Sequence, residues 1–230
     1  RLAHDPRFVV PRVIDEYSSP QILTTSYEAN CSVRDPRVQK LSQARRNRLG
    51  SAFLDLFFDE FFRWGMVQSD PHFGNYRFRI GERADDDRIV LLDFGATRVF
   101  GRGFIENYSD IVEGWLRRDR EQVLRGAKAI GLMNDKMPRA ALDAFAEMCE
   151  AIVEPFEAAD DAAADKSLRN RDGAYRWGDS DLPMRSGRIA AMNALSVHFR
   201  VPPREIVFLH RRLAGVFIML ATLNCEVDGR

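Results

Sequence analysis

The stretch that decides the fold of this chain reads Gln68-Ser69-Asp70-Pro71-His72-Phe73-Gly74-Asn75, followed after a short gap by Leu91-Leu92-Asp93-Phe94-Gly95. It supplies two carboxylates and an amide in a fixed order: Asp70, then Asn75 five positions later, then Asp93. Oxygen groups of this kind are the ligands that Mg²⁺ takes from proteins, together with phosphates and water. Neither motif is specific alone, but the two in this order predict one joint site.

The spacing of the two motifs matches the catalytic loop and metal-binding turn of phosphoryl-transfer enzymes. We therefore expect Asp70 to be the catalytic residue, which orients an incoming hydroxyl or water. Asn75 and Asp93 are expected to be the metal ligands that hold Mg²⁺ on the phosphates of a nucleotide.

The segment between the motifs predicts a hairpin. Residues 76–80 alternate like a half-buried strand, and residues 88–92 form a second strand that runs into Asp93. The polar loop between them carries Asp85, Asp86 and Asp87, which we expect to form a solvated turn. A hairpin would place Asn75 and Asp93 at the same end, close enough to share a cation.

The residues of these motifs resemble those of the AarF/UbiB-type atypical kinase-like family, which includes mitochondrial proteins needed for ubiquinone biosynthesis. The matching patterns are Gln-x-Asp-Pro-His-x-Gly-Asn, Leu-Leu-Asp-Phe-Gly-Ala-Thr-Arg and the tail Leu-His-Arg-Arg-Leu-Ala-Gly at residues 209–215. The family usually has proline where this chain has Phe73. This chain differs from ordinary protein kinases, which have His-Arg before the catalytic aspartate and Ala-Pro-Glu after the metal-binding turn. Here no His-Arg precedes Asp70 and no Ala-Pro-Glu follows Gly95. The resemblance covers nearly the whole chain apart from residues 157–174.

The resemblance implies an α+β, mostly α-helical fold: the large C-terminal lobe of a protein-kinase-like domain with a remnant strand pair of the small lobe. Residues 1–30 would hold that strand pair (8–13 and 22–27) and the hinge. Residues 31–230 would form the helical lobe, with an insertion at about 157–174. In the hinge, the backbone of Glu28, Ala29 and Asn30 would bind the adenine as the cofactor-binding residues.

The resemblance also implies that part of the small lobe lies upstream of this chain. Its phosphate-contacting lysine should precede the catalytic loop on a strand, yet the lysine that precedes the loop here, Lys40, follows the hinge. We therefore expect a C-terminal fragment of a longer protein, and we expect this fragment alone to be inactive.

Apolar periodicity predicts helices over the rest of the chain. The first of them carries a stripe of Leu49, Phe53, Leu56, Phe57, Phe61 and Trp64 that we expect to lie in the core. The predicted ranges are 42–64, 104–118, 120–130, 138–156, 187–199 and 203–223. Residues 157–171 are expected to be mobile or weakly helical. The last helix contains His210, Arg211 and Arg212, so it is not expected to span a bilayer.

Bulk composition excludes several classes of function. The formal net charge is zero, with 34 basic and 34 acidic residues, so no nucleic-acid partner is expected. Cys31, Cys149 and Cys225 are widely spaced, which predicts neither a disulfide framework nor a zinc site. The chain opens without a methionine, so it gives no information about a signal peptide, and the expected location is cytoplasmic or peripheral at a membrane.

For three further side chains the sequence predicts a structural role rather than a catalytic one. His72 is expected to hydrogen-bond the loop backbone, and His210 to be a packed structural histidine. Arg98 is expected to be solvated or salt-bridged rather than to contact phosphate.

The family resemblance implies binding of ATP and Mg²⁺, with hydrolysis of ATP or phosphorylation of a small molecule or lipid. The setting would be ubiquinone or isoprenoid-lipid metabolism, with a lipid-biosynthesis complex as a partner. An aminoglycoside- or choline-kinase-like phosphotransferase is one alternative, although those enzymes commonly have histidine where this chain has Gln68. A non-catalytic nucleotide-binding scaffold is another.

Overall fold

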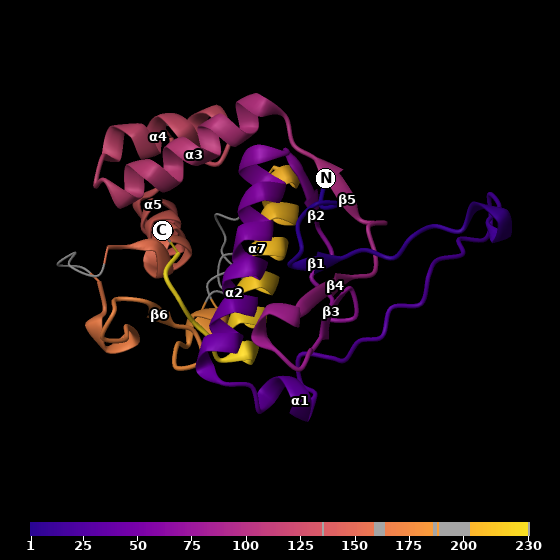
Figure 1. Ribbon diagram of the computed structural model, residues 1–230. Helices are drawn as coiled ribbons and strands as arrows, with labels where there is room; N and C mark the ends of the chain where they lie inside the picture. The colour runs from indigo at the N-terminus through magenta and orange to yellow at the C-terminus, as the bar shows by residue number, and fades with distance from the viewer. Residues whose placement is uncertain (135, 159–163, 186–187, 189–202, 230) are drawn as a thin grey trace.

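The chain folds into a mixed α+β structure in which helices surround a central helix pair and a small sheet packs at one side (Figure 1). The computed structural model describes residues 1–229 except 135, 159–163, 186–187 and 189–202. The strands are β1 (Phe8–Val9), β2 (Met66–Gln68), β3 (Tyr76–Arg79), β4 (Arg88–Leu91), β5 (Thr97–Val99), β6 (Tyr175–Arg176) and β7 (Glu226–Val227). The α-helices are α1 (Pro36–Gln39), α2 (Gln43–Phe58), α3 (Arg102–Leu116), α4 (Arg120–Ala129), α5 (Arg139–Val153) and α7 (Arg204–Leu223).

The central pair is α2 and α7, which lie side by side in Figure 1 and pack against each other. The predicted stripe of α2 is confirmed as core, because Leu49, Phe53 and Leu56 are buried. The end of the predicted helix differs, since Asp59–Arg63 form a π-helical turn, η2, that continues α2. Such turns frequently occur at functional sites. The short 3₁₀ turns are η1 (Asp15–Tyr17), η3 (Ala84–Asp86), η4 (Glu154–Phe156) and η5 (Lys166–Leu168).

Helix α7 is long and apolar enough, by length and composition, to be a membrane span, but just over half of its apolar window is buried inside the protein. Its buried face includes Leu209, Val216 and Leu220, and it packs on α2 and β2. These contacts are those of a core helix, as the sequence predicted.

The predicted hairpin is confirmed. Strands β3 and β4 are antiparallel, with Tyr76 opposite Leu91 and Arg79 opposite Arg88. Its turn is less solvated than predicted, because Asp87 is buried and accepts hydrogen bonds from Arg45 and from the Gly81 backbone. A carboxylate that can bind an arginine and a backbone N–H inside the turn no longer needs water.

The predicted strand pair at residues 8–13 and 22–27 is confirmed only in part, because the two segments pair antiparallel near Val13 and Thr25 but form no continuous strands there. The first strand shrinks to β1, which pairs in parallel with β4 and so joins the hairpin sheet. Residues 10–27 form an arm that reaches away from the body (Figure 1), held by isolated antiparallel bridges between Val13 and Thr25 and between Ser19 and Ile22. Its apolar side chains, including Leu23 and Tyr27, are exposed. A two-stranded ribbon without a third strand or a packed face has little to stabilise it.

The helices α3, α4 and α5 confirm the predicted ranges to within a few residues. Strand β5 was not predicted. It pairs with β2 and ties the segment after Asp93 to the segment before Asp70. In the described part of the predicted insertion, Ala164 and Arg169 are buried and the only helical turn is η5, which agrees with the expected weak helical structure. The predicted helix at 187–199 falls almost wholly outside the described residues.

Candidate active site

The two sequence motifs meet because β2 and β5 pair side by side. Gln68 lies opposite Thr97, and one residue later the Ser69 backbone N–H and hydroxyl both donate to the Ala96 carbonyl, at 3.2 and 2.7 Å. The chain therefore enters the Asp70 loop directly beside the turn that carries Asp93.

Gln68 links the two loops through its side chain. This residue is buried, its Nε2 donates to the Asp93 carbonyl at 2.6 Å, and its Oε1 accepts the Asp70 backbone N–H at 3.1 Å. Both ends of one amide are used, so a shift of either loop breaks a hydrogen bond inside the protein. Gln68 thus fixes Asp70 relative to Asp93.

Asp70 and Asn75 contact each other across the loop. The Asn75 Nδ2 donates to Asp70 Oδ2 at 3.0 Å and lies 3.4 Å from the Asp70 carbonyl. An asparagine amide has one donor end and one acceptor end. Because Asp70 occupies the donor end, the oxygen of Asn75 is the end left for a cation.

Asp93 lies at the same end of the hairpin as Asn75, as predicted. The Leu92 N–H donates to the Asn75 carbonyl at 3.0 Å, which closes this end of the ladder. One carboxylate oxygen of Asp93 accepts the Gly95 N–H at 2.7 Å, and the side chain is exposed. Its second oxygen makes no hydrogen bond within the described residues.

The donor set fits Mg²⁺ better than a transition metal. Among the described residues, no three His, Cys, Asp or Glu side chains gather in one place, which excludes a preformed zinc-type cluster there. Mg²⁺ usually takes one or two protein carboxylates and completes its shell with phosphate and water. Asn75 and Asp93 could supply that partial set.

Arg211 was not identified as a site residue from the sequence, although its tail motif was noted. Its Nη2 lies 3.0 Å from Asp70 Oδ1 and donates to it. Farther along the same helix, Gly215 faces Pro71 so closely that an added Cβ would lie 2.1 Å from the Pro71 Cβ. Helix α7 therefore underlies the loop that carries Asp70.

Glu28, Ala29 and Asn30, the residues predicted to form the hinge, are tethered to β3. Arg79 pairs with the Glu28 carboxylate and contacts the Ala29 carbonyl at 3.3 Å, while Arg77 donates to the Asn30 side chain at 2.9 Å. Hydrogen bonds from Ser26 and Arg79 lower the pKa of Glu28. The backbone N–H groups of these three hinge residues make no hydrogen bond within the described part of the chain, which leaves them free for a ligand.

The remaining candidates are structural. The His72 Nδ1 accepts the Gly74 N–H at 3.0 Å, so it bonds the loop backbone as predicted. Arg98 is half-buried and makes no salt bridge within the described residues, because its guanidinium stacks 3.5 Å from the centre of the Phe208 ring and its Nε is buried there without a hydrogen-bond partner. A flat cation on an aromatic face needs less water than a free one.

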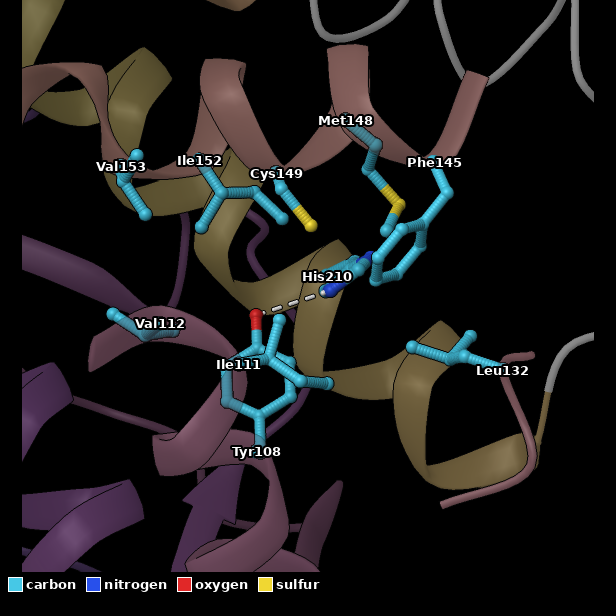
Figure 2. Close-up of a pocket in the computed structure, with 10 residues that line it drawn as sticks. All are labelled: Tyr108, Ile111, Val112, Leu132, Phe145, Met148, Cys149, Ile152, Val153 and His210. Atoms are coloured by element: carbon cyan, nitrogen blue, oxygen red, sulfur yellow. Dashed lines mark hydrogen bonds between the residues drawn. The ribbon is translucent and has the colours of Figure 1, made fainter. Parts of the chain in front are cut away.

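Away from these loops, a narrow pocket lies between α3, α5 and α7. Its lining is almost entirely apolar, and Figure 2 shows His210 hydrogen-bonded to the Tyr108 hydroxyl at its wall, at 3.1 Å. Burial lowers the pKa of His210 to about 4 and raises the pKa of Cys149 to about 12. Both groups are therefore neutral near pH 7, and the packed structural role predicted for His210 is confirmed.

Comparison with known proteins extends the resemblance beyond the motifs. Residues 1–127 match the ABC1 atypical kinase-like domain. The mitochondrial atypical kinase COQ8B of Rattus norvegicus is 31% identical over 230 residues, covering 100% of this chain and 40% of that protein. The mitochondrial atypical kinase coq-8 of Caenorhabditis elegans is 28% identical over 95% of this chain and 27% of its own length. This chain thus spans less than half the length of these relatives.

A solved structure supports the fold. A Mycobacterium tuberculosis protein solved in complex with erythromycin superposes with a TM-score of 0.68 at 20% identity, covering 99% of this chain and 52% of that one. At this identity the similarity concerns the fold alone.

Proposed function

The chain belongs to the family of ABC1 atypical kinase-like domains, and on that premise we propose that it binds Mg–ATP and hydrolyses it or phosphorylates a small molecule or lipid. The family match confirms the resemblance to AarF/UbiB-type proteins and disfavours the aminoglycoside- or choline-kinase-like alternative. Activity, acceptor and partners are properties of the whole protein, and for this chain they are proposals.

Each site residue has a role in this proposal. Asp70 orients the attacking hydroxyl or water, and its hydrogen bonds from Asn75 to Oδ2 and from Arg211 to Oδ1 hold the carboxylate in one orientation. Asn75 and Asp93 hold Mg²⁺, which neutralises charge on the phosphates when it is bound. The backbone of Glu28, Ala29 and Asn30 binds the adenine.

The observation that carries the proposal is the bridge made by Gln68. A single buried side chain holds the Asp70 backbone and the Asp93 backbone together, although 22 residues lie between them. Most of the catalysis of phosphoryl transfer comes from such positioning and from preorganised charge. A scaffold without catalytic function would not need this fixed relation between a base and a metal ligand.

The proposed cellular role rests on the names of the relatives and not on the geometry of the site. Their names describe mitochondrial atypical kinases, and we propose for this protein a role in ubiquinone or isoprenoid-lipid metabolism. A lipid acceptor would place the protein at a membrane surface or in a lipid-biosynthesis complex.

The proposal is tested by Asp70→Ala in the complete protein. Because Asp70 acts on the nucleophile and not on the nucleotide, turnover should fall by roughly 10²–10⁴-fold, while the Kd for Mg–ATP stays within a few-fold. ATPase assays and titration calorimetry measure the two quantities, and Asp86→Ala in the exposed hairpin turn is the control. Wild-type turnover in Asp70→Ala would favour the non-catalytic scaffold.

A further inference from the structure

An ion pair lies completely inside the protein beneath the candidate site. Arg212 on α7 is 0% exposed, and its Nε donates to Oε2 of Glu60 in the π-helical turn η2 at 3.1 Å. The guanidinium is sandwiched between two aromatic rings, 5.0 Å from the Phe53 centroid and 4.7 Å from the Tyr76 centroid. The sequence analysis noted Arg212 only within the tail motif of the last helix and did not identify Glu60.

The pair is poorly arranged for stability alone. Nη1 and Nη2 of Arg212 make no hydrogen bond within the described residues, although Nη2 lies 3.1 Å from the same carboxylate oxygen. Burial raises the pKa of Glu60, against the charge of Arg212. Buried ion pairs that leave donors unsatisfied are commonly no more stable than apolar side chains of similar size. Another role would explain its presence better.

Both partners contact the strands that carry the site residues. The Gln68 backbone N–H favours the charged form of Glu60, and η2 packs on β2. On the other side, Arg212 stacks on Tyr76, the residue that follows Asn75. One buried pair therefore contacts β2 beside Asp70 and β3 beside Asn75.

We propose that Glu60 and Arg212 are positioning residues that hold the Asp70 loop and Asn75 in register with Asp93. Because η2 packs on β2, the pair supports the strand that carries Gln68, and the side chain of Gln68 then contacts the Asp70 and Asp93 backbones. This role rests on the proposed phosphoryl-transfer function for its effect on turnover. Its effect on the loop is physical and does not depend on that function.

The test is the double variant Glu60→Met/Arg212→Met in the complete protein. Removing both charges avoids an unpaired buried ion, so the variant should fold with a thermal midpoint close to that of the wild type. Hydrogen exchange in residues 66–75 should become at least about tenfold faster, because the link to Gln68 is lost. Turnover of Mg–ATP should fall by up to about 10-fold, because supporting contacts made directly to a metal ligand are worth about 10–100-fold and this pair lies one contact farther away.

A matched control is Arg45→Met/Asp87→Leu, which removes another largely buried ion pair at the far end of the β3–β4 hairpin. It should leave both turnover and exchange in residues 66–75 unchanged. Arg212→Lys is a second variant that keeps the charge beside Glu60 but loses the stacked guanidinium. It should shift both readouts in the same direction by a few-fold.

The outcomes separate the two proposals. Wild-type exchange in residues 66–75 in the folded variants would overturn the positioning role, whatever the turnover. Faster exchange with wild-type turnover would also overturn it. The wild type could also have no Mg²⁺-dependent turnover while the variants exchange faster. That result would support the positioning role and refute the proposed function.

Discussion

Substituting Gly215 by alanine should displace the Asp70 loop, because helix α7 contacts that loop at Pro71. An alanine Cβ at this position would lie 2.1 Å from the Pro71 Cβ and 3.3 Å from its Cα. Carbon atoms in contact prefer about 3.5–4.0 Å, so one of the two must move by roughly 1.5 Å. The Pro71 ring has a fixed backbone angle and no flexible end that could turn aside. The movement therefore passes to Asp70, its neighbour in sequence.

The magnitude follows from two opposing effects. Alanine should favour helix α7 by up to about 1 kcal/mol relative to glycine, whereas the overpacking costs about 1–3 kcal/mol. The net loss of stability should be about 0–2 kcal/mol, too small to unfold a typical domain. Turnover should fall much further, by up to about 10²-fold, because a shift of about 1 Å in a positioning element costs that much.

Chemical denaturation and Mg–ATP turnover of the complete protein measure the two effects. Gly103→Ala is the control, since Gly103 lies in helix α3 with no neighbouring heavy atom within 4 Å of an added Cβ. A Gly215→Ala variant with wild-type turnover would refute the reasoning. It would show that α7 does not support the position of Asp70.

Two further predictions concern pH and the hinge. Burial keeps His210 neutral, with a pKa of about 4 in the folded protein against 6.5 in the unfolded chain, so its contribution to stability is present above pH 6.5 and is lost as the pH falls from 6.5 toward 4. At 1.36 kcal/mol per pKa unit this amounts to at most about 3 kcal/mol, less because the residue keeps some solvent contact. Denaturation at a series of pH values should show a shallower decline for His210→Phe than for the wild type, and parallel curves would contradict this. At the predicted hinge, Arg79→Met removes the ion pair with Glu28 and should weaken nucleotide binding by up to about fivefold, which is the worth of a surface ion pair. Calorimetric titration of nucleotide, with Arg83→Met as the control, measures this effect. Equal affinities in the two variants would argue against an adenine site there.

The local parts of this structure could be predicted from the sequence. The β3–β4 hairpin needs only alternating strands and a polar loop, and its register then places Asn75 beside Asp93. The phenylalanine stripe of α2 could be predicted for the same reason, because helical period alone decides which side chains face the core.

The features that the sequence did not predict depend on contacts between segments that lie far apart in the chain. Arg211 reaches Asp70 across 141 positions and Arg212 reaches Glu60 across 152, so no local pattern indicates either pair. The exposed arm at residues 10–27 has a strand-like sequence, but its two segments pair only at isolated bridges because no third strand or packed face supports them. The sequence predicts Asp87 to be solvated together with Asp85 and Asp86, but the fold places Arg45 beside it.

The most direct test of the proposed site is the Mg²⁺ dependence of nucleotide affinity in Asp93→Asn. The substitution keeps the size of the side chain and an oxygen that can accept the Gly95 N–H, but it removes the charge offered to the cation. Calorimetric titration of ATP with and without Mg²⁺ should show that Mg²⁺ strengthens binding to the complete wild-type protein and to the control Asp86→Asn. In Asp93→Asn this gain should be absent. An unchanged gain from Mg²⁺ would show that Asp93 is not a metal ligand, and the proposed phosphoryl-transfer site would then be wrong.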